Sequence, residues 1–411
     1  MDYAARREQI YRPLRAEGIF TWDWLYGQEY ALADPVAISA RELEELRAAT
    51  AALGAIYAKT VAIVQAGDDQ LLAELGLPAA AFSAVRQPFL GGAATLIGRF
   101  DFIRTPAGWK MLEFNSDTPG GIVEAFYVNG QVCAFHAAAD PNAGQHNLLA
   151  AAFVAARDYY HNRGHRLESV VFSALDWHSE DAGTTRYLLQ ASGLPATFVA
   201  LKDLRLVADR LCYRRGDDFV PVDLWYRLHP LGLLAEDRDD DGYPTGASLL
   251  SLIAGRRLAV INPPGALIAQ TKALQALIWA LAENGEFFSS QEAAAIAAHM
   301  LPTYCENRLA GRSPYVVKPV LGREGGGITI HTADGGILHQ DGDKYYWDQP
   351  MIYQQYQELE QLETETLAGR QTGRLIWSCF LINGQPAAVG ARLGGAITDD
   401  MAYFVPVRLA G

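Results

Sequence analysis

Acidic, amide and guanidinium side chains are spaced along two neighbouring β-prone runs in a pattern that could bind a metal ion. Between the runs lies T-P-A-G-W at residues 105–109, where Pro presets φ and Gly suits the left-handed position of a three-residue hairpin loop. If the two ends of this loop pair, Asp101 faces Glu113 and Arg99 faces Asn115. The strand period of two then places all four side chains on one face.

Two carboxylates that face each other on a sheet destabilise it, so the Asp101 and Glu113 pair needs an explanation. A divalent cation would supply one, because carboxylate and amide oxygens, including that of Asn115, suit Mg²⁺. The alternative is a solvated face on which Arg99 neutralises an acid. The pattern alone favours this second interpretation, and other stretches of the chain bear on the choice.

A glycine-rich stretch and two lysines predict a site for phosphate groups. Lys318 lies in a predicted strand, and G-R-E-G-G-G at residues 322–327 forms the turn of a hairpin, where glycines let backbone N–H groups approach phosphate oxygens. Lys272 lies in the first turn of a helix, where it opposes the dipole unless an anion is near. Neither the Walker nor the dinucleotide motif is present. A flexible hairpin without ligand explains the glycines equally well, but the apolar strand at 352–356 adds a backbone that could pair with adenine.

Hydrophobic periodicity predicts the elements that must position these residues. Helical spacing of apolar residues predicts helices at 39–66, 148–162 and 271–282. A short apolar run predicts a buried parallel strand at 170–175, and two further runs predict strands at 196–201 and 257–262. We expect Ser179 to cap a helix that begins at Glu180 and Asp181. Residues 236–241 are an acidic run that we interpret as a solvated loop. The strand, helix, strand order indicates an α/β fold.

Composition excludes several classes of protein. The chain has 411 residues and a net charge of −13, which argues against a nucleic-acid-binding surface. No apolar run follows the N-terminus as in a signal peptide, and we expect no stretch long enough to span a membrane, so a cytoplasmic location is predicted. The four cysteines lack metal-binding spacing, which makes reduced thiols the expectation.

Together these motifs resemble the glutathionylspermidine synthase family, the synthetase members of the ATP-grasp superfamily. The matching segments follow the family order over nearly the whole chain: G-R-F-D-F (98–102), M-L-E-F-N-S-D-T-P (111–119), V-D-L-W-Y-R-L-H-P-L (222–231), T-K-A-L-Q-A-L-I-W (271–279), Y-V-V-K-P-V-L-G-R-E-G-G (315–326), I-Y-Q-Q-Y (352–356), A-V-G-A-R (388–392) and I-T-D-D-M-A-Y-F-V-P (397–406). The resemblance implies an ATP-grasp fold with an adjoining pre-ATP-grasp α/β domain. It predicts helices and a metal-ligand hairpin in residues 1–150, a substrate domain in 151–265 and a nucleotide-binding region in 266–411.

The same resemblance implies an ADP-forming ligase that joins an acid to an amine through an acyl phosphate, with ATP and Mg²⁺ as cofactors. The roles it implies are carried over motif by motif. The metal ligands would be Asp101, Glu113 and Asn115, and the catalytic arginines Arg99 and Arg392. ATP would contact Lys272, Lys318, Gly322, Gly325, Gly326, Gly327, Gln354, Gln355 and Tyr356. Substrates would contact Ser116, Thr118, Glu180 and Asp181, the last two on the amine side. An acid pair at a helix start also stabilises the helix dipole, so that alternative stays open.

Two departures from the family pattern bear on the substrates. The chain starts directly at the synthetase, so we expect no amidase activity, and Arg392 is followed by L-G-G where many relatives have an acid. The acid substrate, glutathione or another peptide, and the amine, a polyamine or another, are therefore not fixed by these residues. Two alternatives share the motifs: a catalytically silent nucleotide-binding regulator, and a phosphotransferase on the same fold.

Overall fold

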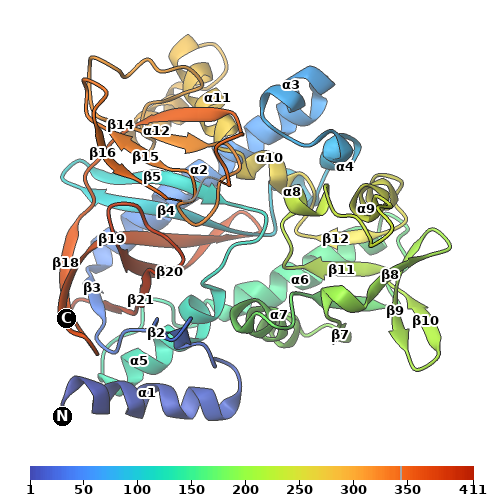
Figure 1. The fold of residues 1–411 in the computed structure, drawn as a ribbon, viewed down its shortest axis with the longest axis horizontal. Coiled ribbons are helices and arrows are strands. Elements are labelled where there is room, and N and C mark those ends of the chain that lie inside the picture. Colours follow the sequence, from blue (N-terminus) through green and yellow to red (C-terminus); the bar gives the residue numbers. More distant parts are fainter. Residues whose placement is uncertain (343–344) are drawn as a thin grey trace.

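The computed structural model describes residues 1–342 and 345–411 and has an α/β fold built around several sheets (Figure 1). A six-stranded antiparallel sheet lies at its centre, in the order β21-β20-β19-β4-β5, with β18 also paired to β19. Its strands are β4 (Ile97–Thr105), β5 (Gly108–Asn115), β18 (Gln361–Thr366), β19 (Gly369–Ile382), β20 (Gln385–Gly394) and β21 (Tyr403–Val405). The predicted metal-ligand hairpin thus shares one sheet with the C-terminal strands.

The predicted pairing of the hairpin is confirmed, but its loop is not the one expected. Thr105 pairs with Gly108, so two residues rather than three form the loop, and Asp101 nevertheless pairs with Glu113. A β-bulge between Asp101 and Phe102 restores the register by leaving Leu112 without an opposite residue. The extra residue in β5 compensates for the residue missing from the loop.

A second antiparallel sheet has the order β13-β17-β14-β15-β16. Its strands are β13 (Thr303–Tyr304), β14 (Tyr315–Pro319), β15 (Thr329–His331), β16 (Ile337–Gln340) and β17 (Met351–Gln355). The prediction that the 352–356 strand keeps a free backbone edge for adenine is wrong. The short strand β13, which the sequence analysis did not predict, pairs with one edge of β17, and β14 pairs with the other.

A parallel sheet, β12-β11-β6-β7, forms a third layer with helices beside it (Figure 1). It contains the three predicted strands, observed as β6 (Val170–Ser173), β7 (Ala196–Phe198) and β12 (Ala259–Ile261), together with β11 (Leu224–Arg227). Strands β6 and β12 are buried, whereas β7 lies at the edge of the sheet and is partly exposed. Its helices are α6 (His146–His161), α7 (Ser179–Ser192) and α9 (Thr245–Ala254). An attached antiparallel sheet consists of β8 (Leu204–Val207), β9 (Arg210–Arg215) and β10 (Asp218–Pro221). The acidic run at 236–241 is mostly exposed, as expected.

Helix α7 begins one residue earlier than predicted. Its cap is His178, whose Nδ1 accepts a hydrogen bond from the backbone N–H of Asp181 at 3.2 Å, and Ser179 is the first helical residue. An imidazole nitrogen takes the place of the expected hydroxyl because it reaches the same N–H group.

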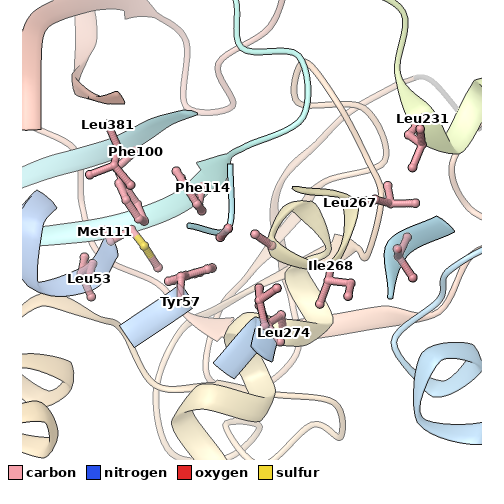
Figure 2. Close-up of a cluster of buried hydrophobic side chains, with 14 of the residues drawn as sticks. Leu53, Tyr57, Phe100, Met111, Phe114, Leu231, Leu267, Ile268, Leu274 and Leu381 are labelled. Carbon is pink, nitrogen blue, oxygen red and sulfur yellow. The ribbon is translucent and has the colours of Figure 1, made fainter. Parts of the chain in front are cut away.

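Helix α2 (Ala40–Ala66) packs against β19 and β20 and forms the centre of the largest hydrophobic core. Figure 2 shows its Leu53 and Tyr57 beside Phe100 and Phe114, two stacked rings of the hairpin whose centroids lie 3.8 Å apart. These rings alternate along β4 and β5 with the polar residues, so one hairpin face enters the core and the other is left for chemistry.

Helix α2 also corrects one prediction. Among the described residues, α2 is the one helix whose length and apolar composition would allow it to cross a membrane. The sequence analysis expected no such stretch. Half of its apolar window is buried inside the protein, and core helices of soluble proteins pass the same test. The remaining helices are α1 (Tyr3–Glu17), α3 (Asp69–Glu74), α4 (Phe82–Val85), α5 (Asn129–Phe135), α8 (Leu231–Leu234), α10 (Ala266–Gln270), α11 (Lys272–Asn284) and α12 (Ser290–His299). The remaining strands are β1 (Trp24–Leu25), β2 (Gln28–Glu29), β3 (Val36–Ile38) and β22 (Val407–Leu409).

Candidate active site

A cavity of about 240 Å³ lies where the two antiparallel sheets meet the segment between β5 and α5. It collects residues from distant parts of the chain. The predicted site residues that line it are Arg99, Asp101, Glu113, Asn115, Thr118, Glu180, Lys318, Gly325, Gln354, Gln355, Tyr356 and Arg392. The predicted site residues outside its lining are Ser116, Asp181, Lys272, Gly322, Gly326 and Gly327.

Asp101 is the buried centre of a charged cluster. The Nε and Nη2 atoms of Arg99 donate to its two carboxylate oxygens at 2.8 and 2.9 Å, and Arg392 Nη2 donates to Oδ2 at 2.8 Å. Asn115 Nδ2 lies 3.2 Å from Asp101 Oδ2 and 3.3 Å from Glu113 Oε1. The two predicted catalytic arginines and the three predicted metal ligands therefore form one contiguous group.

Glu113 connects this group to the two lysines. Lys272 Nζ lies 3.3 Å from Glu113 Oε2 and donates to the Gly322 carbonyl at 2.8 Å. Burial alone would raise the pKa of Glu113, but the nearby ammonium groups of Lys272 and Lys318 lower it to about 2. Burial lowers the pKa of Lys318 to about 8. Lys272 thus lies behind the cavity wall and binds the glycine-rich loop to the carboxylate.

The charges of this cluster do not cancel. Four basic side chains (Arg99, Arg392, Lys272 and Lys318) surround two carboxylates (Asp101 and Glu113), which leaves a surplus of two positive charges in a largely buried place. Such a surplus fits a polyanion, because buried charge needs a counter-charge. Polyphosphate that carries Mg²⁺ matches both the surplus and the oxygen ligands.

The donor set fits a magnesium ion held jointly with phosphate. Within the described residues no three His, Cys, Asp or Glu side chains converge on one point, so a metal site here would consist of two carboxylates, the Asn115 amide and ligand oxygens. Both carboxylate oxygens of Asp101 accept hydrogen bonds from arginines. Guanidinium groups bind phosphate oxygens as well as carboxylates, so the same arginines can serve a phosphate and leave Asp101 to a metal ion. Asp101, Glu113 and Asn115 are therefore the residues that would hold the ion.

The β-bulge contributes a backbone acceptor to the cavity. The carbonyl oxygen of Leu112 accepts hydrogen bonds from Lys318 Nζ at 3.3 Å, Gln354 Nε2 at 3.3 Å and Gln275 Nε2 at 3.4 Å. The bulge thus directs one main-chain dipole at the buried ammonium group of Lys318. This contact joins the two antiparallel sheets at the cavity.

The glycine-rich loop is the predicted hairpin turn between β14 and β15, but most of its glycines do not face the cavity. Gly322 donates its N–H group to the carbonyl of Pro319 at the end of β14, Gly326 donates to the Arg323 carbonyl within the loop, and Gly327 donates to the Asp341 carboxylate. Gly325 alone of the predicted glycines lines the cavity, at φ +76°, and a Cβ there would lie 2.6 Å from the Thr398 carbonyl. The expected cradle of glycine N–H groups is therefore not formed as predicted.

The end of the cavity between the two antiparallel sheets is apolar. Its lining there consists of Leu301, Val316, Ile328, Ile330, Leu359 and Ile376. Gln355, Tyr356 and Gln357 border it where β17 ends. An apolar slot with a few polar groups at its edge suits a flat heterocycle such as a purine.

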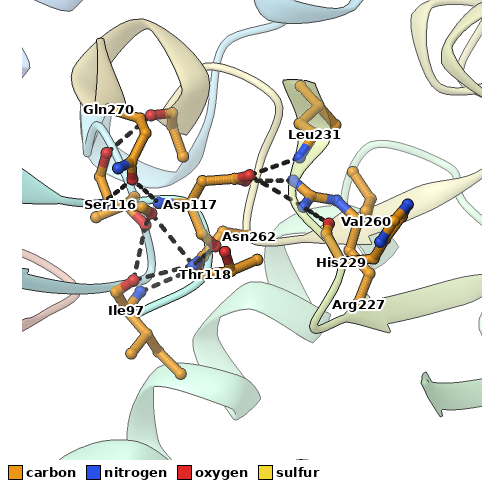
Figure 3. A network of polar contacts seen from close by, with 12 residues as sticks. Ile97, Ser116, Asp117, Thr118, Arg227, His229, Leu231, Val260, Asn262 and Gln270 are labelled. Atoms are coloured by element: carbon orange, nitrogen blue, oxygen red, sulfur yellow. Dashed lines mark hydrogen bonds and ion pairs between the residues drawn. The ribbon is translucent and has the colours of Figure 1, made fainter. Parts of the chain in front are cut away.

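The segment that follows Asn115 is held by buried side chains (Figure 3). Gln270 Oε1 accepts from the N–H groups of Ser116 and Asp117 at 2.9 and 3.1 Å. The Asn262 side chain hydrogen-bonds the backbone of Ile97, Ser116 and Asp117. The Ser116 hydroxyl donates to a carbonyl of α10, is fully buried and lies outside the cavity lining, so Ser116 is not positioned for its predicted contact with substrate.

Asp117, which the sequence analysis did not single out, anchors this segment to the parallel sheet. Its carboxylate forms a buried ion pair with Arg227 of β11 and accepts from the Leu231 N–H at 2.7 Å. Thr118, next along the chain, lines the cavity and accepts from Arg323 Nη2 at 3.4 Å. The parallel sheet therefore positions the loop that leaves the metal-ligand hairpin.

The opposite end of the cavity is acidic. Glu124, in a π-helical turn (Glu124–Val128), is 1% exposed and accepts hydrogen bonds at Oε1 from Trp22 Nε1 and Tyr30 Oη. Its Oε2 has no hydrogen-bond partner among the described residues. Burial and the Glu124 carboxylate raise the pKa of Glu180 to about 8. Asp181 lies outside the lining and its carboxylate is 3.4 Å from His178 Nδ1, so the structure separates the two predicted amine-side acids.

Sequence reasoning gave no site role to five charged residues that line the cavity, which are Glu124, Arg323, Glu324, Asp399 and Asp400. Arg323 lay within the glycine-rich motif but received no role. Glu124 was visible as a lone acid in the apolar run I-V-E-A-F-Y-V, residues 122–128. A charged residue inside such a run signals a buried polar function, because an unpaired buried charge is costly.

Comparison with known proteins identifies the family and supports the fold. Residues 4–410 match the model of the family described as "Glutathionylspermidine synthase preATP-grasp". A Haemophilus influenzae protein named "Putative acid--amine ligase" is 24% identical over 273 residues, which are 64% of this chain and 63% of that protein's length. A glutathione synthetase-like effector from Globodera pallida, solved in its apo form, shares the fold with a TM-score of 0.61 at 11% identity, over 100% of this chain and 98% of the other.

Proposed function

Because the chain belongs to the glutathionylspermidine synthase preATP-grasp family, we propose that it is an ATP-dependent ligase that joins a carboxylic acid to an amine. The acid would be phosphorylated to an acyl phosphate, and the amine would displace phosphate to form an amide, with ADP as the second product. The name of the Haemophilus influenzae relative supports the same class of reaction.

The observation that carries this proposal is the order of three environments along one cavity. The apolar slot would accept a purine, the cationic cluster would accept a triphosphate, and the acidic end would accept a positively charged amine. The acid substrate would lie between the last two, near Thr118, where its carboxylate meets both the γ-phosphate and the amine. Such alignment supplies the proximity on which phosphoryl and acyl transfer depend.

The charged residues of the cationic cluster, together with Arg323, have distinct roles in this scheme. Lys318, Arg392 and Arg323 would bind phosphate oxygens, and Arg99 would stabilise the negative charge that develops on the transferring phosphoryl group and the carbonyl oxygen. Glu113, kept ionised by the adjacent lysines, would hold Mg²⁺ together with Asp101 and Asn115. When bound, Mg²⁺ supplies neutralisation of the polyphosphate charge.

Phosphate release from ATP tests the proposal most directly. Purified protein with ATP and Mg²⁺ is assayed against a panel of acids and small peptides, glutathione included, each with and without a mixture of polyamines. We expect release that requires both an acid and an amine, and a product lighter by one water than their sum in mass spectrometry. Formation of ADP and a phosphorylated product without phosphate release, and without any need for an amine, would instead indicate a phosphotransferase. Nucleotide binding without any turnover would indicate a silent regulator.

A further inference from the structure

Amide formation requires the amine to lose a proton, and this requirement leads to a role for Glu124. An alkylamine has a pKa of about 10 and is therefore protonated at neutral pH. Only the neutral form has the lone pair that attacks an acyl phosphate. A ligase of the proposed kind therefore needs a proton acceptor beside the amine, and this inference rests on the proposed function.

We propose that Glu124 is the group that accepts this proton. Its side chain lines the cavity, is 1% exposed, and is fixed at one oxygen by Trp22 and Tyr30. The other oxygen, Oε2, is buried without a hydrogen-bond partner among the described residues. A buried carboxylate oxygen that lacks a donor is costly, so its retention at a cavity wall points to a ligand that supplies one. An ammonium group is such a donor.

The position of Glu124 relative to the reacting groups follows from tight packing. A Cβ on Gly183 of α7 would lie 2.0 Å from the ring of Trp22, so the helix that carries Glu180 packs directly on the side chain that holds Glu124. A Cβ on Gly120 would lie 3.2 Å from Glu180 Oε1 and 4.0 Å from Arg99 Nη1. The acidic end therefore adjoins the arginine assigned to the developing oxyanion.

The charged and titratable surroundings favour proton uptake by this pair of carboxylates. The groups that act on Glu124 are Trp22, Tyr30, Arg99 and Glu180. The groups that act on Glu180 are Glu124, Asp181, His178 and Glu324. Burial raises the pKa of both Glu124 and Glu180, and each carboxylate disfavours ionisation of the other. The pair therefore takes up one proton more readily than an exposed acid does.

The step balances without any further reactant. The ammonium nitrogen passes one proton to Glu124 Oε2 and becomes neutral. Its lone pair forms the new C–N bond, while the bond between the acyl carbon and the phosphate oxygen breaks. The second nitrogen proton leaves with the phosphate as hydrogen phosphate, and Glu124 later releases its proton to solvent.

The substitution Glu124→Gln tests the role, because glutamine keeps an oxygen for Trp22 and Tyr30 but has no basic oxygen. Product formation is measured with ATP, Mg²⁺ and glutathione, or the acid identified by the phosphate-release panel, using either spermidine or hydroxylamine as the amine. Hydroxylamine is mostly unprotonated at neutral pH and needs no acceptor. We expect the rate with spermidine to fall about 10²–10⁴-fold. The rate with hydroxylamine should stay within a few-fold.

A matched control and a second measurement separate this role from a structural one. Glu168→Gln, at an exposed acid outside the cavity, should leave both rates unchanged. Equal loss with both amines, or an unchanged spermidine rate, would overturn the role of Glu124. If the variant does not fold, the pH profiles of the wild-type protein decide: the spermidine rate should rise with pH and level off once the acceptor is ionised, well below the amine's own pKa of about 10, and the hydroxylamine rate should not rise. A spermidine rate that keeps rising up to about pH 10 would show that solvent, and not Glu124, takes the proton. Failure of the wild type to form either product with any acid would instead refute the ligase.

Discussion

The two ends of the cavity differ in how their charges are satisfied. At the cationic end each carboxylate already has partners: Asp101 contacts Arg99 and Arg392, and Glu113 contacts Lys272. At the acidic end Glu124 keeps a buried oxygen without a partner among the described residues, and its neighbour Glu180 has a raised pKa. The first end thus resembles a preorganised binding site, and the second a site whose electrostatics are completed by a cationic ligand.

The two ends are also built from different elements. Strands β4, β5, β14 and β20 carry most of the cationic cluster, whose side chains alternate with core residues along rigid sheets. A π-helical turn and the first turn of α7 carry the acids. Sheets hold the groups that would have to stay fixed during the proposed phosphoryl transfer. Helix ends and a π-turn, which often marks functional sites, hold the groups assigned to the variable substrate.

Removing the charge of Glu113 should have the largest effect. Glu113→Gln removes a proposed metal ligand and the counter-charge of two lysines, so we expect ATP turnover to fall about 10³-fold or more while the fold is retained. Phosphate release and circular dichroism measure these two properties. Glu363→Gln, at an exposed acid of β18, is the control. Unchanged turnover in Glu113→Gln would refute the metal site.

Breaking the buried ion pair between Asp117 and Arg227, which anchors the segment after β5 to the parallel sheet, should have the next largest effect. Arg227→Met leaves Asp117 buried without its ion-pair partner, so we expect a loss of about 3–5 kcal/mol in unfolding free energy. Urea unfolding measures it. Arg370→Met, which breaks an exposed ion pair with Glu363, should cost less than about 1 kcal/mol. Equal losses of unfolding free energy in the two variants would show that the buried ion pair stabilises the fold no more than an exposed one does.

A smaller effect is expected when the cationic end loses one of several phosphate-binding groups. Lys318→Met should raise the KM for ATP about 10–100-fold, because a hydrogen bond to a charged group is worth about 1.5–3 kcal/mol. Steady-state kinetics at varied ATP concentration measure it, with Lys202→Met, an exposed lysine, as the control. A KM that does not change would exclude Lys318 from the nucleotide site.

The stability of the protein should depend on pH because of Glu180 at the acidic end of the cavity. The folded pKa of Glu180 is raised to about 8, so the folded protein binds more protons than the unfolded chain between about pH 4.5 and 8, and stability falls as pH rises through this window. Glu180→Gln removes this penalty and should stabilise the protein by about 1–3 kcal/mol near pH 9, but little near pH 4. Thermal unfolding at both pH values measures it. Equal effects at both would show that Glu180 is not held in an unfavourable charged state.

Local patterns predicted the pairing of Asp101 with Glu113 although the predicted loop was wrong. The hairpin has a two-residue loop, and the bulge at Leu112 restores the register that a three-residue loop would have given. Alternation along β4 and β5 decides which face each residue occupies, and alternation is a local property of a strand. A bulge is harder to predict, because it depends on what the neighbouring strand and cavity require.

Sequence patterns could not place the edge of β17, the orientation of the glycine loop or the surroundings of Ser116. The short strand β13 covers the backbone that was expected to be free, and Gly326 packs so closely on the ring of Tyr346 that a Cβ would lie 2.6 Å away. These outcomes depend on which segments pack together in space. Propensity within a segment carries no information about them.

The sequence by itself determined which polar residues of the hairpin share one face, because local alternation and turn residues act within a few positions of each other. Tertiary structure alone decided that β19 pairs with β4, which brings Arg392 to Asp101 across 291 positions of the chain. It also assembled the acidic end from Trp22, Glu124 and Glu180. Such contacts follow from sheet order and close packing, which depend on the whole chain at once.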